Sequence, residues 1–353
     1  MGLSAKRSRP LVLGATIGLA IVAAAACSSS EAGGPTAVGR DAATEATPTP
    51  TDGAAETSTT EAGDGGALPA DITVLAEGFV DLAGVVATET AVYFVERAPG
   101  IVHAVPLTGG TATNVATNAG TPSSIAVTGA DLFWGDRGQG TLSRSPLAGG
   151  TAATATPSPG RAPAAIVATV DRIVVVALGN GDVGEIQQYG LDFSAGPAIG
   201  PQNNPYDVAV RGSDFFWTEG QTGTIWTATL GASLATQAAT LESDCQSIAA
   251  DASGLYWSRP SEGMVRAKLG TSVTITLATA QKSPSSLAAD ASGVYWLTSD
   301  GKLRRSTRNE LPLRTVAQGF SGGFSDPRIQ ALALTNDYVV WVTPDGKVLR
   351  HDK

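Results

Sequence analysis

Two stretches of the sequence carry nearly the same eleven residues: "SIAADASGLYW" at 247–257 and "SLAADASGVYW" at 286–296. Their last residues lie 39 positions apart. A near-duplicate at a spacing close to forty residues indicates that one structural unit is repeated along the chain. The period therefore has to be followed through the whole sequence before any single motif is interpreted.

Five further stretches share the pattern, and each ends in an aromatic or aliphatic pair. They are "GVVATETAVYF" (84–94), "SIAVTGADLFW" (124–134), "AIVATVDRIVV" (165–175), "DVAVRGSDFFW" (207–217) and "ALALTNDYVVW" (331–341). The last residues of the seven copies are spaced 40, 41, 42, 40, 39 and 45 apart. Seven copies thus occupy the chain from residue 84 to its end.

Each copy contains the same order of elements. A short apolar run is followed by a turn rich in Gly, Asp, Ser and Asn, and then by a second run that ends in the pair. A Gly-containing turn leads to a third run, and a fourth run rich in Thr, Ala and Val completes the copy. Short β-favouring runs between turn signals predict strands. No amphipathic period of 3.6 residues persists long enough for a helix, so the fold class is predicted to be all-β.

Four strands in each of seven units of about forty residues predict a seven-bladed β-propeller over residues 68–353, with six or eight blades as alternatives. The seventh copy stops after its third run. The missing strand is predicted at the other end of the domain, because "DITVLAEG" (71–78) resembles "LRTVAQGF" (313–320), the fourth run of the sixth copy. An N-terminal strand that closes the last blade, with Val74 and Leu75 packed against it, would remove an open sheet edge.

The repeated residues are interpreted as structural. The aromatic pairs are expected to pack between neighbouring blades, and the third copy has Val174 and Val175 in their place. Asp251 and Asp290 are expected to end first strands, where an Asp side chain accepts hydrogen bonds from turn backbone. A repeated calcium loop is the alternative, but each copy offers a single carboxylate at this point.

The N-terminus has the pattern of an export signal. Lys6, Arg7 and Arg9 precede an apolar run of residues 11–26, and residues 1–26 are predicted to be a signal peptide. The run ends in "AAAC", which resembles a bacterial lipobox, so Cys27 is predicted to be lipidated. The alternative is an ordinary signal that is cleaved nearby, with Cys27 incidental. Several acyl chains on one Cys would give durable anchoring.

The segment after Cys27 differs in composition from the repeats. Residues 28–67 consist mainly of Thr, Ala, Gly, Pro, Ser and Glu, lack aromatic residues and carry seven acids against Arg40. Such a composition buries too little apolar surface to offset the entropy of ordering. Residues 27–67 are therefore predicted to be a lipidated Cys followed by a disordered acidic tether.

Charge restricts the partners. Without residues 1–26 the chain has 20 basic and 32 acidic residues, a balance of −12. An acidic surface disfavours nucleic acid and anionic lipid as direct partners, so membrane contact is expected through the lipid anchor only. The predicted location is the bacterial cell envelope. Ser28 and Ser29 lack the acid that retains some lipoproteins at the inner membrane, which favours the outer membrane in a Gram-negative cell.

The blade pattern resembles a known family. The order "IAAD…LYW", a Gly turn and then "VRAKLG" is similar to the YWTD-type propeller repeat of lipoprotein receptors and their bacterial relatives. Asp136 and Glu219 lie two residues after a Trp, where that motif has its acid, and Glu96 follows Phe94 at the same distance. The family is six-bladed and only three copies here keep the acid. The resemblance implies a recognition scaffold and supplies no catalytic residue.

No residue pattern of an enzyme stands out. His103 and His351 lie on third runs of different copies without metal-ligand spacing, and no G-x-S-x-G motif occurs. Streptogramin-lyase-like propellers have a similar order of strands and turns in each blade and use His in catalysis. Lactonase-like propellers use clustered acids around a metal in the central channel. Only Asp207 lies near the predicted channel entry. No catalytic residue, cofactor or metal site is predicted. Cys245 is expected to be buried and inert, with an exposed reactive thiol as the alternative.

The predicted ligand surface is the face that carries the loops from second to third strand and from the fourth strand to the next blade. Its candidate binding residues are Arg97, Asp136, Arg137, Tyr206, Glu219 and Arg259. Two functions remain open: a binding or scaffolding module for an envelope protein or glycan, which is favoured, and a hydrolase or lyase acting on a small exported substrate. Solvated loop charge without a ligand is the simplest interpretation of these residues.

Overall fold

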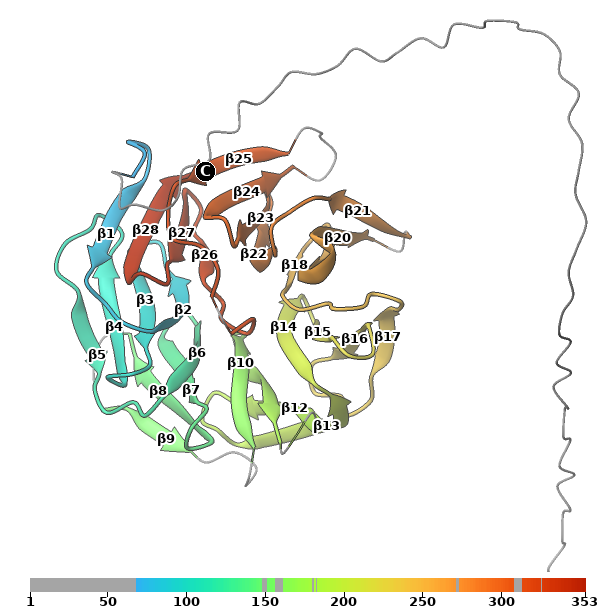
Figure 1. Cartoon of the computed structure of the whole chain (residues 1–353). Coiled ribbons are helices and arrows are strands. Elements are labelled where there is room, and N and C mark those ends of the chain that lie inside the picture. The colour runs from blue at the N-terminus through green and yellow to red at the C-terminus, as the bar shows by residue number, and fades with distance from the viewer. Residues whose placement is uncertain are drawn as a thin grey trace, which may run out of the picture. The chain divides into compact units, whose positions relative to one another are not determined.

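The computed structural model describes residues 68–147, 151–155, 161–179, 181, 183–270, 273–307, 313–324 and 326–353. The predicted signal peptide (1–26) and the predicted lipidated Cys27 with its tether (27–67) lie outside these residues. Seven four-stranded antiparallel sheets form a ring around a central channel (Figure 1). The prediction of an all-β, seven-bladed propeller is confirmed, and the alternatives of six or eight blades are excluded.

The blades follow the sequence copies, and each runs from an innermost to an outermost strand. Blade 1 contains β2 (Leu82–Ala87), β3 (Ala91–Glu96), β4 (Ile101–Pro106) and β5 (Thr113–Ala116). Blade 2 contains β6 (Pro122–Val127), β7 (Asp131–Asp136), β8 (Thr141–Pro146) and β9 (Ala153–Ala155). Blade 3 contains β10 (Ala162–Ala168), β11 (Arg172–Leu178), β12 (Val183–Gly190) and β13 (Ala195–Asn203). Blades 4 and 5 are β14 (Pro205–Arg211), β15 (Asp214–Glu219), β16 (Thr224–Thr229) and β17 (Thr236–Ala239); and β18 (Ile248–Asp251), β19 (Gly254–Arg259), β20 (Met264–Leu269) and β21 (Thr274–Ala278). Blades 6 and 7 are β22 (Ser285–Asp290), β23 (Gly293–Thr298), β24 (Lys302–Ser306) and β25 (Arg314–Gln318); and β26 (Leu332–Leu334), β27 (Tyr338–Val342), β28 (Lys347–Asp352) and β1 (Thr73–Glu77).

The second strands hold the core, because their side chains lie between neighbouring blades. Trp217, Trp257, Trp296 and Trp341 have no exposed surface, and Trp134 is 2% exposed. The predicted packing role of the aromatic pairs is therefore confirmed. The third blade differs as expected, since its second strand contributes aliphatic side chains that pack with Phe133 and Tyr189.

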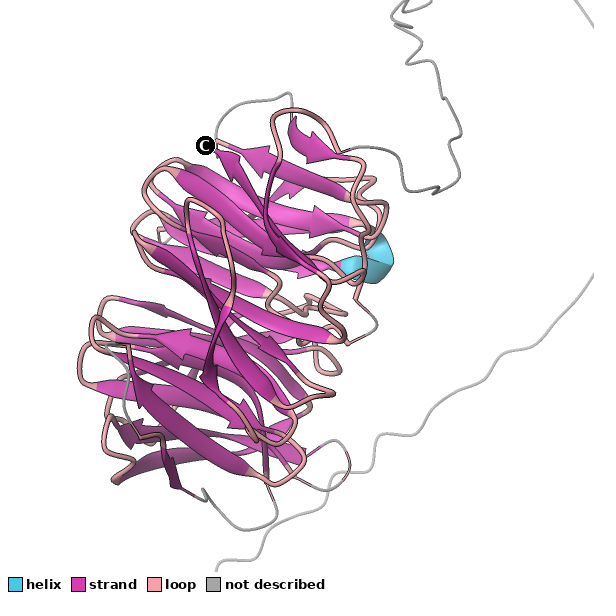
Figure 2. Ribbon diagram, turned by 90° about the vertical axis from the view of Figure 1, so that its left-hand side faces the viewer, coloured by secondary structure: helices cyan, strands magenta, loops and turns pink. Residues whose placement is uncertain are grey.

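Helical structure is nearly absent from the described residues. A single 3-10 helix, η1 (Pro260–Glu262), follows β19 on one face of the ring (Figure 2). No helix in this part of the chain is both long and apolar enough to cross a membrane.

The ring is closed by strands from both ends of the domain. Strand β1 pairs antiparallel with β28, with Thr73 opposite Arg350 and Glu77 opposite Lys347. The predicted N-terminal strand of the last blade is confirmed. Successive side chains of a strand point to opposite faces, so Leu75 is buried whereas Val74 is 39% exposed. The expectation that both would be packed holds for Leu75 alone.

Neighbouring first strands are also joined by polar contacts around the channel. Ser247 Oγ accepts a hydrogen bond from Leu287 N at 2.9 Å, which links blade 5 to blade 6. Ser123 Oγ donates to Pro163 O at 3.1 Å, which links blade 2 to blade 3. In five blades the first strand has a β-bulge at its start, and such bulges redirect side chains toward a neighbour.

Candidate functional site

The two faces of the ring carry different loops. We name the face with the loops from second to third strand and from the fourth strand to the next blade the strap face. The opposite face, with the loops from first to second and from third to fourth strand, is the turn face. All six predicted binding residues on the propeller lie at the strap face.

Asp136 and Glu219 lie at the ends of second strands and are 3% exposed. Asp136 Oδ1 accepts hydrogen bonds from Thr121 Oγ1 at 2.8 Å and from Gly138 N at 2.8 Å. Glu219 accepts from Asn203 N at 2.7 Å and from Trp226 Nε1 at 2.9 Å. Each carboxylate therefore fastens the loop that enters its blade, which is the place of the acid in the YWTD-like pattern.

Gly120 shows how closely that loop approaches Asp136. The backbone of Gly120 has φ +71°, and a Cβ atom there would lie 1.7 Å from Asp136 Oδ2. Only glycine satisfies both conditions at low cost. The acid and the glycine together fix the loop between blades 1 and 2.

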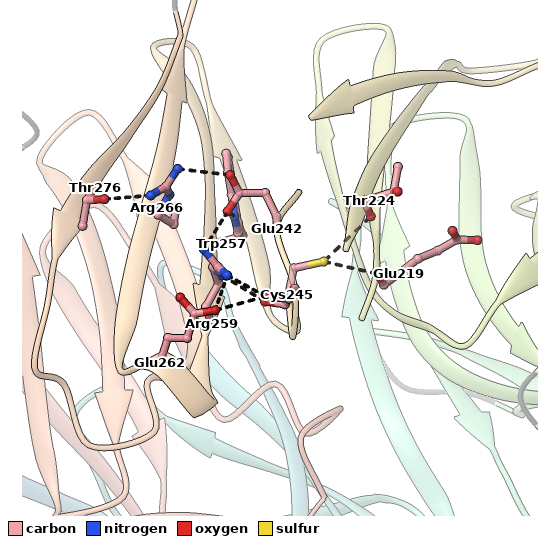
Figure 3. A network of polar contacts seen from close by, with 10 residues as sticks. Glu219, Thr224, Glu242, Cys245, Trp257, Arg259, Glu262, Arg266 and Thr276 are labelled. Atoms are coloured by element: carbon pink, nitrogen blue, oxygen red, sulfur yellow. Dashed lines mark hydrogen bonds and ion pairs between the residues drawn. The ribbon is translucent and has the colours of Figure 1, made fainter. Parts of the chain in front are cut away.

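Arg259 lies in a buried polar network between blades 4 and 5 (Figure 3). Its Nε donates to Ser243 O at 2.9 Å, and its guanidinium forms ion pairs with Glu242 and Glu262. Glu242 is 3% exposed and also accepts from Trp257 Nε1 at 3.1 Å. The network orients the loop from β17 to β18, so Arg259 is 8% exposed and holds protein groups.

Cys245 lies beside this network and is fully buried. Its Sγ donates to Glu219 O at 3.4 Å (Figure 3). Burial raises the pKa of the Cys245 thiol to about 12. Because thiolates are the reactive form, this thiol is unreactive near neutral pH, as the preferred sequence interpretation expected.

The chain between β25 and β26 reaches into the centre of the ring (Figure 1). We name residues 319–331, of which all but residue 325 are described, the strap. It lies within the longest interval between sequence copies, the one of 45 residues. Asp326 Oδ2 lies 2.8 Å from Arg137 Nη1 and 3.8 Å from Arg97 Nη1, so the strap is held by blades 1 and 2.

Arg328 holds the strap to the other side of the ring. Its Nη2 donates to Asn204 Oδ1 at 2.6 Å, and its guanidinium lies 4.3 Å from the centre of the Tyr206 ring. This places the strap on blade 4, and a cation over an aromatic face adds electrostatic attraction.

The end of the strap is fastened at the channel itself. Gln330 O accepts from Val85 N of blade 1 at 3.0 Å, and Ile329 O accepts from Ser286 Oγ of blade 6 at 2.9 Å. The strap therefore contacts blades 1, 2, 4 and 6 and crosses the mouth of the channel.

Three of the predicted residues thus come together and three do not. Arg97, Arg137 and Tyr206 meet the strap, and the side chains of Arg97 and Arg137 are 25% and 37% exposed. Asp136, Glu219 and Arg259 are buried beneath separate loops. Asp326 and Arg328 were not among the predicted residues, although the interval of 45 residues marked the place where the repeat is interrupted.

Three arginines lie at the mouth of the channel. Arg97 pairs with Asp81, Arg137 pairs with Asp326, and Arg328 lies over the Tyr206 ring. Residues 68–353 as a whole carry 19 basic and 25 acidic residues. The strap region therefore gathers arginine side chains on an acidic domain.

Asp207 lies near the strap end of β14. Its Oδ2 accepts from Ile248 N at 3.0 Å and from Ser247 Oγ at 3.2 Å, and so joins blade 4 to blade 5. Asp207 is partly buried at this junction between the two blades. Desolvation by burial raises the pKa of Asp207 to about 6, although these hydrogen bonds favour the charged form.

The two histidines lie apart. His103 Nε2 donates to Glu96 Oε2 at 2.9 Å, and its ring stacks on Phe94 with centres 5.0 Å apart. His351 lies 3.3 Å from Asp71 near the closing strand. Within the described residues, no three His, Cys, Asp or Glu side chains are grouped as a metal site would require.

Comparison with known proteins shows which solved structures share the fold of this chain. No protein-family model and no curated protein matches it. Among solved structures it resembles a streptogramin B lyase with a TM-score of 0.64 and 15% identity, covering 79% of this chain and 96% of that one. It also resembles virginiamycin B lyase from Staphylococcus aureus, with a TM-score of 0.65, 13% identity and coverage of 80% and 98%.

A WD40 β-propeller domain of Doa1 is equally similar, with a TM-score of 0.64, 13% identity and coverage of 80% and 98%. Identities this low show the fold alone. The chain is therefore a β-propeller protein whose structural neighbours include both enzymes and WD40 domains, and whose YWTD-like motifs remain a resemblance.

Proposed function

We propose that this chain is an exported lipoprotein, anchored in the bacterial cell envelope through Cys27, whose propeller binds an envelope protein or glycan at the strap face. The blades are proposed to be related to the YWTD-type repeat. The observation that supports binding is the strap itself, because it brings Arg97, Arg137 and Tyr206 into one surface over the channel mouth.

This surface has the chemistry of a recognition site. Arginine and tyrosine are enriched where binding energy concentrates, because both combine a large contact area with directional polar groups. The strap is held by several blades, so little ordering entropy is lost when a partner binds. Arg97 and Arg137 remain partly exposed beside their acid partners, so their guanidinium groups can contact an acidic group of a partner.

The binding proposal is tested by capture of envelope components on the immobilised whole chain. Arg137→Ala is expected to lower retention of the captured partner by about tenfold, the size of a moderate interface contact. Arg172→Ala is the matched control, since Arg172 is also partly exposed but pairs with Asp171 at the turn face. Equal retention by both variants would contradict the proposed surface.

The anchoring proposal has its own test. Cys27→Ala is expected to leave the protein soluble or unprocessed, whereas the unaltered chain stays with membranes through a high-salt wash. Mass measurement of the native protein should show an acylated Cys27. A Cys27→Ala chain that sediments with washed membranes would refute lipidation, and fractionation of the two membranes tests the outer-membrane location.

The second candidate function is a hydrolase or lyase that acts on a small exported substrate. The observation that supports it is the fold that this chain shares with two lyases. A substrate entering from the strap face would meet the strap before it reached Asp207. Turnover that depends on Asp207 would favour the enzyme over the binding module.

A further inference from the structure

The channel contains a cavity below the strap. Its volume is about 330 Å³, and the first strands of all seven blades contribute to its wall. Among the described residues that line the cavity, Gln330 has the sole polar side chain, and the others are Val, Ile, Leu and Ala. Pockets for small molecules are mostly apolar and measure about 300–1,000 Å³. The cavity meets both conditions.

The cavity is closed at one end and open at the other. At the strap face it is covered by the end of the strap, where Ile329 is 4% exposed and Ala331 is not exposed. Toward the turn face the first strands become more exposed, as Ala87, Ala168 and Ala250 at their ends show. A ligand therefore has access from the turn face.

Two features of the turn face define the chemistry of a ligand. Val170, in the turn between β10 and β11 of blade 3, is 93% exposed, so an apolar side chain lies beside the open mouth. Three exposed acids, Glu89, Asp171 and Asp337, lie in the first-to-second-strand turns at the same mouth. They outnumber Arg172, which pairs with Asp171, and Arg211. The acids oppose a negatively charged head group and tolerate a neutral or positive one.

We propose that the channel is a binding well for the aliphatic chain of an uncharged or cationic amphiphile, which enters from the turn face. The chain would replace water along the apolar wall, and the head group would remain among the turns. Contact of aliphatic side chains with an aliphatic ligand removes apolar surface from water on both sides. The well lies on the face opposite the proposed protein or glycan surface, so either site can exist without the other.

The test uses the whole chain carrying Cys27→Ser, so that no acyl group of its own competes, and N-phenyl-1-naphthylamine as a neutral fluorescent probe. We expect saturable binding at one site per chain. Ala168→Phe and Ala250→Phe, which fill the well from two blades, are expected to weaken binding by about tenfold or more. Ala153→Phe is the matched control, because Ala153 is exposed on β9, the outermost strand of blade 2, away from the channel.

Competition on the chain with an unfilled well tests the ligand class without depending on the folding of the Phe variants. 1-Decanol and decyltrimethylammonium are expected to displace the probe, and decanoate to do so about tenfold less well. Failure of 1-decanol to displace the probe overturns the proposal. Unchanged affinity in Phe variants that keep the original melting temperature also overturns it, and equal competition by decanoate refutes the charge preference.

Discussion

The two ends of the channel are built from the same seven first strands and yet differ in structure. At the turn face each strand ends in a short turn, and the turns of blades 5 and 6 have nearly identical sequences, with Asp251 and Asp290 accepting from Ser253 N and Ser292 N at 2.8 Å. At the strap face the chain leaves the repeat and crosses the mouth. The turns of the regular repeat therefore form the open end of the channel. The strap, which lies in the long interval of 45 residues, forms the closed end.

The same contrast appears in the ionisation of two aspartates on first strands. Asp207, at the strap end of β14, has a pKa raised to about 6 because burial disfavours its charge. Asp290, at the turn end of β22, also loses solvent, but hydrogen bonds from Lys353 and Ser292 outweigh that effect and lower its pKa. Burial and the available hydrogen-bond donors thus decide whether each of these carboxylates favours or opposes folding at neutral pH.

Loss of the closing strand is expected to have the largest effect, because β1 supports blade 7 from one face to the other. Deletion of residues 28–80 removes the pairing with β28 and the buried side chains of Ile72 and Leu75, which are 7% and 3% exposed. Melting temperature should fall by at least about 10 °C, since deletion of buried aliphatic groups costs several kcal/mol. Scanning calorimetry of the two chains measures this.

Deletion of residues 28–67 is the control for that truncation, because it removes the predicted tether and leaves β1 in place. Its melting temperature should stay near that of the intact chain. Aggregation should accompany only the longer deletion, which exposes the edge of β28. Equal melting temperatures for the two truncations would contradict the closing role of β1.

The second prediction concerns the closed end. Because the folded-state pKa of Asp207 lies above its unfolded value of 3.8, the folded state binds the proton more tightly. Protonated Asp207 therefore stabilises the folded state below about pH 4. As pH rises to 6 this contribution to the free energy of unfolding is lost, by at most about 3 kcal/mol. Asp207→Asn should abolish that loss in urea titrations between pH 4 and 7. An unaltered pH dependence would show that Asp207 is not desolvated.

The third prediction concerns the ion pairs of the strap. Asp326→Asn removes the charge that faces Arg97 and Arg137 and should cost about 0.5–1 kcal/mol, as partly exposed pairs do. The difference should vanish in 1 M salt, where exposed charges are screened. Asp345→Asn is the control, because Asp345 forms a comparable exposed pair with Lys347 at 2.6 Å in a regular turn. An equal loss in both variants would show that the strap pairs resemble any surface pair.

The blades, their number and the closing strand could be predicted from the sequence, because each follows from a periodic local pattern. The strap could not, although its interval of 45 residues was visible. Its path depends on Arg137 and Asn204, which lie 189 and 124 residues before their partners Asp326 and Arg328. No local pattern encodes such contacts.

Burial of the loop acids was equally hard to predict. Asp136 and Glu219 were predicted as candidate binding residues of the loop face, with solvated loop charge as the simplest interpretation. The structure buries them because several N–H and O–H groups of the incoming loops need acceptors there. Arg97 and Arg137 follow second strands in the same way and remain partly exposed, since their partners belong to loops at the surface.

The smallest predicted effect concerns the open end and has the opposite sign to that of Asp207. The lowered pKa of Asp290 means that its contribution is present above the unfolded value of 3.8 and is lost as pH falls below it. Asp290→Asn should therefore cost less than about 1 kcal/mol at pH 7, as expected for a partly exposed pair, and progressively less toward pH 3.

Lys353→Met tests the cause of this effect, because the Lys353 ammonium forms the ion pair with Asp290 while Ser292 N holds the turn. The variant should lose most of the acid sensitivity that Asp290 contributes and keep the turn. Urea titrations at pH 3, 5 and 7 distinguish loss of the ion pair, which changes the pH dependence, from loss of the turn, which lowers stability at every pH. If Asp290→Asn and Asp207→Asn changed stability in the same direction at pH 7, the electrostatic difference between the two ends of the channel would be refuted.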